Sequence, residues 1–496
     1  MVVGAGGLEP PTNGLKGRCS TIELHSQPLR IEVRRPRSLA IKATQSRIFK
    51  GLFNHPSPTL YLRDWGGIGF LGCKRPNPVW WFDISPGAFQ VQLMWMRLWI
   101  GVLAGLGLTG SVLAEVVAVE VHGGARERVE VLCEFALPAF KGQTLALKMK
   151  DGTRLPLQVD DRGQAMFILP KLAKEGSAFL ELDVTGAPTK RQVFTTRKGR
   201  KLRLEFNGNV IAEYQAEAAD LPREGISPLY RRGGYLHPVF TPRGKLVTDD
   251  FPLQHTHHHG IWFPWTNARF EERKPDFWNM GGGTGRVDFV KLDKTWSGPV
   301  HGGFRAVHRF EDLTVKPAKA VLLETWEVRV YALTGGARPK WIFDLTSTQT
   351  CAGPSPLILP QYRYGGLGVR GHRTWDHPAD NPTRFLTANG VNDRQQAHAT
   401  RARWCYMGGQ VEGAQAGLAI LGHPDNFRAP QPMRVHPKEP FFNYAPQQFG
   451  DMAIKPNRRY VSRYRFVTLD GEPNATELAQ IWEDFSNPPM VNTIEK

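Results

Sequence analysis

The sequence predicts an all-β protein built from two β-sandwich domains, and three observations lead to this prediction. Apolar and polar residues alternate through most of the chain after Glu115, as in strands that bury one face. The 51 glycines and 38 prolines favour many turns over long helices. The 14 tryptophans are typical of β-sandwich cores or of sugar-binding surfaces. A chain of 496 residues has room for two or three such domains.

The predicted strands are short segments, rich in β-branched and aromatic residues, that end at Gly, Pro, Asn or Asp. They cover residues 116–122, 128–135, 144–150, 201–206, 287–292, 322–331, 341–348, 417–421 and 460–467. A single C-terminal helix is predicted, beginning after Asn474, which can serve as its N-cap. Its apolar residues fall on one face: Leu478, Ile481, Trp482 and Phe485.

A domain boundary is predicted within residues 186–200, where turn residues mix with a basic run. Residues 115–190 are expected to form a small immunoglobulin-like β-sandwich of six or seven strands. Residues 200–490 are long enough for a large domain of two packed sheets. No repeat of fixed period is present, which disfavours a propeller.

The first 93 residues are expected to be a spurious or disordered extension. They keep neither a helical nor a strand period. Residues 4–25 resemble the peptide that results when a tRNA gene is translated conceptually.

Residues 94–114 are predicted to be a signal peptide that is cleaved after Ala114. Arg97 supplies a basic start, residues 98–113 are apolar, and Val112 and Ala114 provide the small residues of a cleavage site. The alternative is a transmembrane anchor, but this apolar stretch is shorter than the ~20 residues that span a bilayer. The protein is therefore expected to be secreted or periplasmic, with no stable membrane span after cleavage.

Charge and cysteine spacing exclude two classes of function. Residues 1–114 hold 13 Lys/Arg and 5 Asp/Glu, so they contribute +8 of the formal net charge of +17. In the rest of the chain acidic residues are interleaved with basic ones, and no nucleic-acid-binding motif occurs, so nucleic acid is not expected as a partner. The five cysteines form no CxxC pair, which argues against structural zinc and thioredoxin-like chemistry.

The most distinctive segment is a histidine run. Four of the 15 histidines lie within five residues: His255, His257, His258 and His259. If the run is a strand, His255, His257 and His259 project from one face and could bind a divalent metal, whereas His258 faces the other side. Neutral imidazoles also suit general acid/base catalysis, which makes His257 and His258 catalytic candidates. The alternative is that these histidines only pack against nearby tryptophans or bond turn carbonyls.

Two other segments could converge on this run. Tyr364 and Arg370, in and after a glycine-rich loop, join the catalytic candidates because aromatic faces stack on sugars and guanidinium groups bind hydroxyls or carboxylates. An edge strand with a glycine bulge explains that loop equally well. The candidate substrate-binding residues are His237, Trp262, Trp278, Asn279, Tyr362, His423, Asp425 and Asn426. Asp425 and Asn426 could instead cap a turn.

Glu324 and Glu327 lie three residues apart in one predicted strand, at 322–331. Side chains alternate along a strand, so the two carboxylates face opposite sides and at most one can point into a site. They are not expected to form the carboxylate pair of a glycosidase.

Several motifs together resemble the PmoA-like family of exported bacterial proteins. They are YLHPVFTPRGKLVTDDFPLQHTHHHGIWF at 235–263, DFWN at 276–279, YGGLGVRG at 364–371, HPDNFRAPQPMRVHPKEPFFNYAP at 423–446 and YVSRYRFV at 460–467. The resemblance extends from Leu221 to the C-terminus. Gln254 stands where the resemblance leads us to expect an aspartate, which argues against a carboxylate-assisted role at that position.

The resemblance implies a galactose-mutarotase-like supersandwich and carbohydrate chemistry. Family members are often labelled methane oxygenase, but a methane monooxygenase subunit is an integral membrane protein. No stretch after Glu115 approaches ~20 uninterrupted apolar residues, so methane oxidation is rejected. The leading hypothesis is a carbohydrate-active enzyme (a lyase, hydrolase or epimerase) that acts on a sugar or oxidised glycoside with histidine or metal assistance. The alternatives are a non-catalytic carbohydrate-binding or cell-envelope module and a metal-binding protein without sugar chemistry.

Overall fold

We describe the protein from a computed structural model of the whole chain. The described residues are 70–71, 81–82, 116–185, 192–218, 220–335 and 338–495. The chain divides into two compact units, Met1–Leu113 and Ala114–Lys496. In the first unit, the described residues form two short antiparallel strands, β1 (Phe70–Leu71) and β2 (Trp81–Phe82). The other sequence predictions for residues 1–93, and the signal peptide predicted at 94–114, lie outside the described residues.

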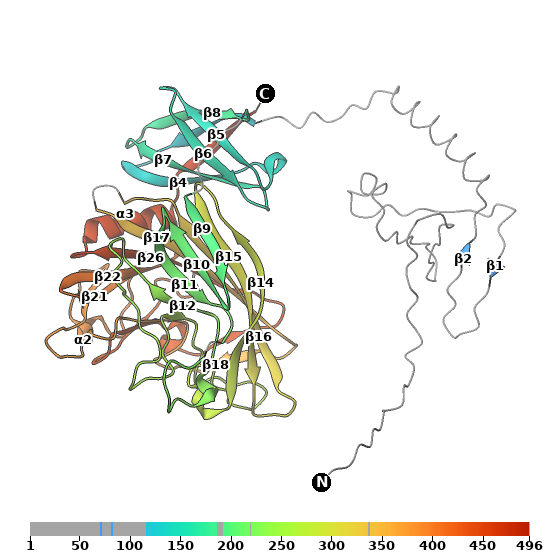
Figure 1. The fold of residues 1–496 in the computed structure, drawn as a ribbon, viewed down its shortest axis with the longest axis vertical. Coiled ribbons are helices and arrows are strands. Elements are labelled where there is room, and N and C mark those ends of the chain that lie inside the picture. The colour runs from blue at the N-terminus through green and yellow to red at the C-terminus, as the bar shows by residue number, and fades with distance from the viewer. Residues whose placement is uncertain are drawn as a thin grey trace, which may run out of the picture. The chain divides into compact units, whose positions relative to one another are not determined.

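The second unit begins with a small β domain, which we call the small sandwich because its one sheet folds around an apolar core (Figure 1). Its seven strands form one antiparallel sheet in the order β27-β3-β8-β5-β6-β7-β4. They are β3 (Val116–His122), β4 (Arg128–Ala136), β5 (Thr144–Met149), β6 (Arg154–Val159), β7 (Gln164–Leu172), β8 (Ser177–Asp183) and β27 (Met490–Glu495). The last strand was not predicted, because it pairs with β3, which lies at the opposite end of this unit in the sequence. The sheet encloses an apolar core of alternating residues that includes Val119, Leu147 and Phe167.

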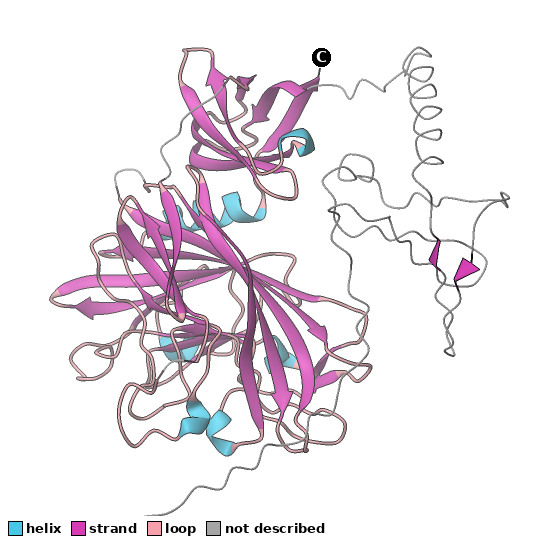
Figure 2. Cartoon of the chain, turned by 45° about the vertical axis from the view of Figure 1, so that its right-hand side comes forward, coloured by secondary structure: helices cyan, strands magenta, loops and turns pink. Residues whose placement is uncertain are grey.

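The larger sandwich contains two eight-stranded antiparallel sheets (Figures 1 and 2). We call the first the site sheet; its order is β23-β24-β19-β13-β12-β11-β10-β9. Its strands are β9 (Val193–Lys198), β10 (Lys201–Phe206), β11 (Asn209–Gln215), β12 (Tyr235–Val239), β13 (Ile261–Trp262), β19 (Leu367–Arg370), β23 (Met433–Val435) and β24 (Phe441–Tyr444). It consists mostly of short strands separated by long loops, and those loops carry most of the candidate site residues.

We call the second sheet the long sheet; its order is β14-β15-β16-β17-β26-β22-β21-β20. Its strands are β14 (Gly285–Trp296), β15 (His301–Asp312), β16 (Lys319–Tyr331), β17 (Lys340–Cys351), β20 (Arg384–Thr387), β21 (Trp404–Val411), β22 (Ala414–Gly422) and β26 (Tyr460–Asp470). A separate pair joins β18 (Leu357–Leu359) to β25 (Met452–Ile454). The helices among the described residues are α2 (Arg394–Ala397) and α3 (Ala475–Ser486), with 3-10 turns at Pro138–Phe140, Pro228–Tyr230, Met280–Gly282 and Pro446–Phe449.

The predicted all-β sandwich class and the C-terminal helix are confirmed. The main core takes residues from both large sheets, such as Ile261 and Val369 from the site sheet and Trp326 from the long sheet. Helix α3 begins where the sequence predicted, and the Asn474 side-chain oxygen accepts a hydrogen bond from the Glu477 backbone N–H at 3.1 Å.

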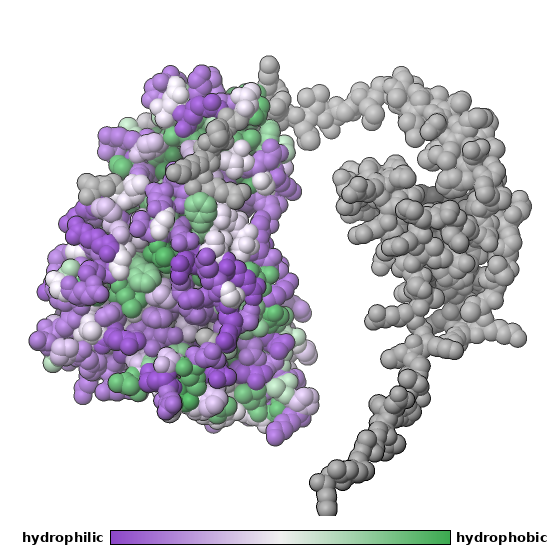
Figure 3. Space-filling model, viewed as in Figure 1, coloured by the Kyte–Doolittle hydropathy of each residue, from purple (hydrophilic) through white to green (hydrophobic). Residues whose placement is uncertain are grey.

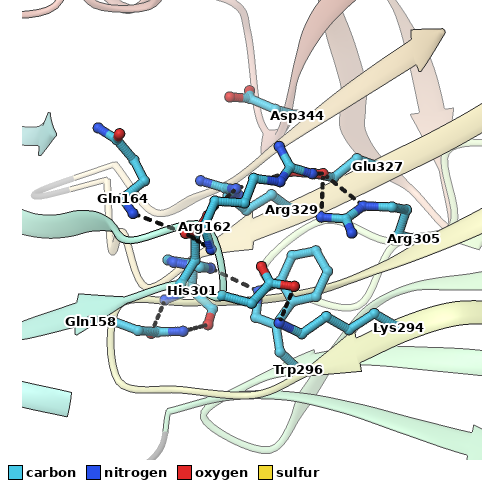
Figure 4. A network of polar contacts seen from close by, with 12 residues as sticks. Gln158, Arg162, Gln164, Lys294, Trp296, His301, Arg305, Glu327, Arg329 and Asp344 are labelled. Atoms are coloured by element: carbon cyan, nitrogen blue, oxygen red, sulfur yellow. Dashed lines mark hydrogen bonds and ion pairs between the residues drawn. The ribbon is translucent and has the colours of Figure 1, made fainter. Parts of the chain in front are cut away.

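The two sandwiches are joined by a continuous seam of apolar and polar contacts. Leu132 and Met166 of the small sandwich belong to the same apolar cluster as Leu478 of α3. Figure 4 shows the polar part, where the buried Gln158 bonds the long sheet. Its amide nitrogen donates to the His301 carbonyl at 2.9 Å, and its oxygen accepts from the Val300 and His301 N–H groups at 3.2 and 3.1 Å. A cavity of about 250 Å³ lies beside these contacts.

Replacing Gln158 with alanine should destabilise this seam by about 2 kcal/mol or more. The substitution leaves the N–H groups of Val300 and His301 and the His301 carbonyl, at the start of β15, without this buried partner. Each group that stays unsatisfied costs about 1–3 kcal/mol. The free energy of unfolding in urea measures the loss. The matched control is Gln143→Ala, because Gln143 is exposed beside the same seam. Equal effects of the two substitutions would contradict the role given to Gln158.

The surface of the described residues is polar with scattered apolar side chains on the face shown in Figure 3. Within the described ranges, no helix is both long enough and apolar enough to cross a membrane.

Candidate functional site

The candidate site lies on the outer face of the site sheet, away from the main core. Neighbouring residues on its strands point in opposite directions, so Ile261 enters the main core while Trp262 faces outward. The same alternation separates Phe442 from Phe441 on β24. Trp262 and Phe441 join Tyr235 and Trp278 in a separate aromatic cluster, against which Tyr364 packs. This second cluster is the floor of the site.

The histidine run does not form a strand, and the predicted alternation of its side chains is therefore wrong. The run forms consecutive turns between β12 and β13, in which the His255 N–H donates to the Pro252 carbonyl and the His258 N–H donates to the His255 carbonyl. Gly260 ends the run where a Cβ atom would lie 2.1 Å from the Leu236 carbonyl oxygen. The loop thus reaches the sheet only because this residue has no side chain.

The turns bring three of the imidazoles together over the aromatic floor. We call His255, His257 and His258 the histidine cluster. The His258 ring stacks on His255 with centroids 4.8 Å apart and on Phe441 with centroids 4.7 Å apart. His257 meets His258 edge-on at 4.7 Å. His258 is buried, and within the described structure its Nδ1 atom has no hydrogen-bond partner.

His259 points away from this cluster, so the predicted metal set of His255, His257 and His259 is wrong. Its Nδ1 atom lies 2.6 Å from an Asp250 carboxylate oxygen, and the other oxygen accepts from the Tyr235 hydroxyl at 2.8 Å. In the described part of the chain, no group of three or more His, Cys, Asp or Glu side chains is arranged to hold a metal ion. The run forms turns and not a strand, and for this reason His259 contacts Asp250 and not the other histidines.

Arg370 borders the histidine cluster and forms a buried ion pair. It ends β19, which lies inside the site sheet and not at an edge. Its Nη2 atom lies 3.0 Å from a Glu439 carboxylate oxygen, and both side chains are buried. The same carboxylate lies 3.4 Å from His377 and 3.9 Å from His255. The Nε and Nη1 atoms of Arg370 are buried and have no hydrogen-bond partner among the described residues.

Tyr364 forms the other side of the site. Its ring meets Trp278 edge-on at 4.8 Å, and its hydroxyl accepts a hydrogen bond of 3.0 Å from Arg434. Tyr362 lies beside it, with ring centroids 5.8 Å apart. The structure therefore brings all four predicted catalytic residues to one region: His257, His258, Tyr364 and Arg370.

The predicted substrate-binding residues of this region differ in what they can contact. Trp262 is fully buried beneath His258, so it supports the histidine and does not present a face to a ligand as predicted. Trp278 is 6% exposed. Asn279 is exposed, and its side-chain oxygen accepts from the Tyr230 hydroxyl at 3.2 Å. His237 is held by Thr248, whose Oγ1 lies 2.9 Å from its Nδ1.

The other predicted binding loop lies elsewhere, so the prediction that it converges on the histidine run is wrong. The His423 ring packs against Phe485 of α3 with centroids 5.0 Å apart. Asp425 pairs with Arg463, and the Asn426 side chain bonds both the N–H and the carbonyl of Arg463. These contacts fix the turn after β22 against β26, which is the structural role considered as the alternative.

Burial keeps the histidines neutral at physiological pH. It is the main cause that lowers the pKa of His257 from 6.5 to about 4, and the neighbouring His255, His259 and Arg370 lower that pKa further. Burial also lowers the pKa of His258 well below its usual value, with the same direction for His255. His436, whose ring lies 6.0 Å from His255, has a pKa of about 4 for the same principal reason. The cluster can therefore accept protons at neutral pH.

These shifts predict that the folded protein loses stability as the pH falls from about 6.5 to about 4. In this window the unfolded chain binds protons at His257 and His436 that the folded chain does not. Each group contributes a slope of up to about 1.4 kcal/mol per pH unit, reduced by solvent screening because both side chains are partly exposed. Urea unfolding at several pH values measures the slope. His257→Gln and His436→Gln should flatten it, and an unchanged slope in both variants would contradict the prediction.

Glu324 and Glu327 face opposite sides of β16, as the sequence predicted. Glu327 points to the seam, where it pairs with Arg305 at 3.1 Å and Arg329 at 2.9 Å. Glu324 is buried between the sheets and lies 3.1 Å from His308, whose other ring nitrogen lies 2.5 Å from the Tyr214 hydroxyl. They do not form a carboxylate pair.

Sequence reasoning missed four residues of the site: Asp250, Arg434, Glu439 and Phe441. Strand alternation could have identified two of them, Arg434 and Phe441, because each is next to a core residue, Val435 or Phe442, and therefore faces the opposite side of the sheet. No comparable signal marks Asp250 or Glu439, which reach the site from irregular segments.

The fold and the site together define an all-β sandwich protein with a histidine-rich polar site on the outer face of one sheet. Residues 201–483 match a family described as a family of unknown function (DUF6807), and the chain belongs to this family. The match covers the larger sandwich from β10 onward and most of α3. No curated protein matches the chain.

Proposed function

We propose that the protein is a secreted or periplasmic carbohydrate-active enzyme, a lyase, hydrolase or epimerase, whose site is the histidine cluster with Arg370 and Tyr364. One observation carries the proposal: buried nitrogen atoms without hydrogen-bond partners concentrate here among the described residues. They are Nδ1 of His255 and His258, Nε and Nη1 of Arg370, Nε of Arg434 and Nε1 of Trp262 and Trp278. Buried polar atoms are normally bonded, so such a concentration indicates a place that an oxygen-rich ligand completes.

The chemical types present suit sugar chemistry. A neutral imidazole can remove a proton from a hydroxyl or from a carbon next to a carbonyl group, and it can return that proton to a leaving group. The guanidinium of Arg370 can stabilise an oxyanion that forms in the transition state. Tyr364 is partly exposed beside Trp278 and can stack on a sugar face. The resemblance to the PmoA-like family favours the same substrate class. This resemblance stays a prediction, because the matched family, DUF6807, is described only as one of unknown function.

The test is a turnover screen of the purified full chain against glycosides, uronate-containing oligosaccharides and keto-glycosides, with products identified by mass spectrometry. We expect product from at least one class, and activity that falls toward pH 4 as His257 becomes protonated. Binding of glycans without any product would favour the non-catalytic carbohydrate-binding module instead. Neither binding nor product across the three classes would refute the proposal.

A further inference from the structure

We propose that the ligand of this site carries a carboxylate, which Arg434 and the free N–H groups of Arg370 bind. The inference rests on the proposed function, since it names the substrate class of the same site: a sugar acid and not a neutral sugar. It follows from the balance of buried charge around the histidine cluster.

Arg434 is a buried cation whose contacts are all neutral. It lies on β23 with its side chain on the outer face, and it is 6% exposed. It donates to the Tyr364 hydroxyl at 3.0 Å, and its guanidinium carbon lies 4.9 Å from the centre of that ring. Its Nη1 atom lies 3.3 Å from His398 Nε2. Among the described residues Arg434 forms no ion pair, and its Nε atom has no hydrogen-bond partner.

Such an arrangement is costly unless something else compensates the charge. Arginine stays protonated in proteins, so Arg434 cannot become neutral. Removing a cation from water costs several kcal/mol, and neutral hydrogen-bond acceptors recover only part of that cost. A bound anion would recover more of it than a neutral ligand could.

Arg370 adds a second buried guanidinium at the same site. Its single ion pair with Glu439 uses Nη2, which leaves its Nε and Nη1 atoms without partners in the described structure. Among the described residues, Glu439 is the one carboxylate that forms an ion pair with either arginine, and it also faces His377 and His255. Asp249 and Asp376 also favour the charged form of Arg370, although neither forms an ion pair with it in the described part of the chain. The histidine cluster is neutral and contributes no compensating negative charge.

The two arginines lie near the same group of packed rings, since the charge of Arg370 acts on His257 and His258. Arg434 contacts Tyr364, Tyr364 contacts Trp278, and the Trp278 and His258 rings are 5.7 Å apart. Both guanidinium groups also lie close enough to His436 to lower its pKa. A planar carboxylate fits the fork of a guanidinium better than a hydroxyl does, because it can accept two parallel hydrogen bonds.

The experiment compares the binding of sugar acids with that of their parent sugars by calorimetry. The probes are glucuronate, galacturonate, glucose, galactose, glucose 6-phosphate and citrate, each titrated into the full chain. We expect at least one uronate to bind at least about tenfold more tightly than its parent hexose, and Arg434→Gln to remove this preference. Arg459→Gln is the control, because Arg459 is an exposed arginine and should leave the preference unchanged.

The outcomes separate this inference from the proposed function. Equal binding of hexose and uronate would overturn the inference and leave a carbohydrate site. Arg434-dependent binding of citrate without any sugar would support the carboxylate and count against carbohydrate as the substrate. Tighter binding of the sugar phosphate than of either uronate, or no binding by any probe, would overturn the inference.

A measurement without ligand provides a second test. If Arg434 is uncompensated in the free protein, Arg434→Met should raise the melting temperature, because it removes a buried charge and keeps an apolar side chain of similar length. A lower melting temperature would show that the guanidinium stabilises the empty protein, and it would overturn the inference.

Discussion

Replacing His258 with phenylalanine is expected to reduce turnover by at least about 100-fold, the scale of general acid–base catalysis. Phenylalanine keeps an aromatic ring against Phe441 and His255 while it removes the nitrogen that lacks a partner. The fold should therefore survive this substitution, whereas alanine would leave a destabilising cavity. His257→Gln tests the neighbouring imidazole in the same way.

The measurement is kcat and KM on the substrate that the screen identifies, together with the free energy of unfolding of each variant. His423→Ala is the matched control, because His423 is also partly buried but packs against Phe485 at a different place. Turnover by His257→Gln and His258→Phe at the wild-type rate would exclude both residues from catalysis. A loss confined to KM would assign them to binding.

Replacing Glu324 with leucine is expected to lower the free energy of unfolding by about 3–5 kcal/mol, the cost of removing one partner from a buried charged network. The carboxylate is 1% exposed and accepts from Ser347 at 2.5 Å and from Gln349 at 2.8 Å. Burial alone would raise its pKa, but these hydrogen bonds and the contact with His308 outweigh burial and lower it. The charged form is therefore the stable one between the sheets.

A second buried group depends on the same carboxylate. Arg232 is 2% exposed, and burial lowers its pKa to about 10 while Glu324 opposes that shift. Urea unfolding of Glu324→Leu measures the loss of stability. The control is Glu217→Gln, because Glu217 forms a largely solvent-exposed ion pair with Arg197, and its loss should cost no more than about 1 kcal/mol. The double variant with His308→Leu should be less destabilised than the sum of the single variants. Strict additivity would show that the two side chains are not coupled.

The sequence by itself determined the fold class and most of the strand positions. Alternation with period two is a local property, so segments such as 116–122 and 201–206 were recognised with the bounds of β3 and β10. The helix after Asn474 was equally local, because its cap and its apolar face lie within one short segment. The opposite orientation of Glu324 and Glu327 followed from the same rule.

Tertiary structure decided which residues meet. The pairing of β27 with β3 closes the small sandwich with the far end of the chain, and no local pattern encodes such a partner. The spacing of residues in the histidine run does not show whether it forms a turn or a strand. Its turns depend on the close contact between Gly260 and β12. These turns direct His259 toward Asp250, so His259 does not join the other two histidines of the predicted metal site.

The histidine run itself was recognisable from the sequence, but its partners were not. Glu439 and Arg434 come from a segment about 180 residues further along the chain. They reach the site because β24 pairs with β19 in the site sheet and β23 pairs with β24. The charge balance that distinguishes a sugar acid from a neutral sugar depends on burial. Burial is a property of the packed sheets and loops, and residue types alone do not determine it.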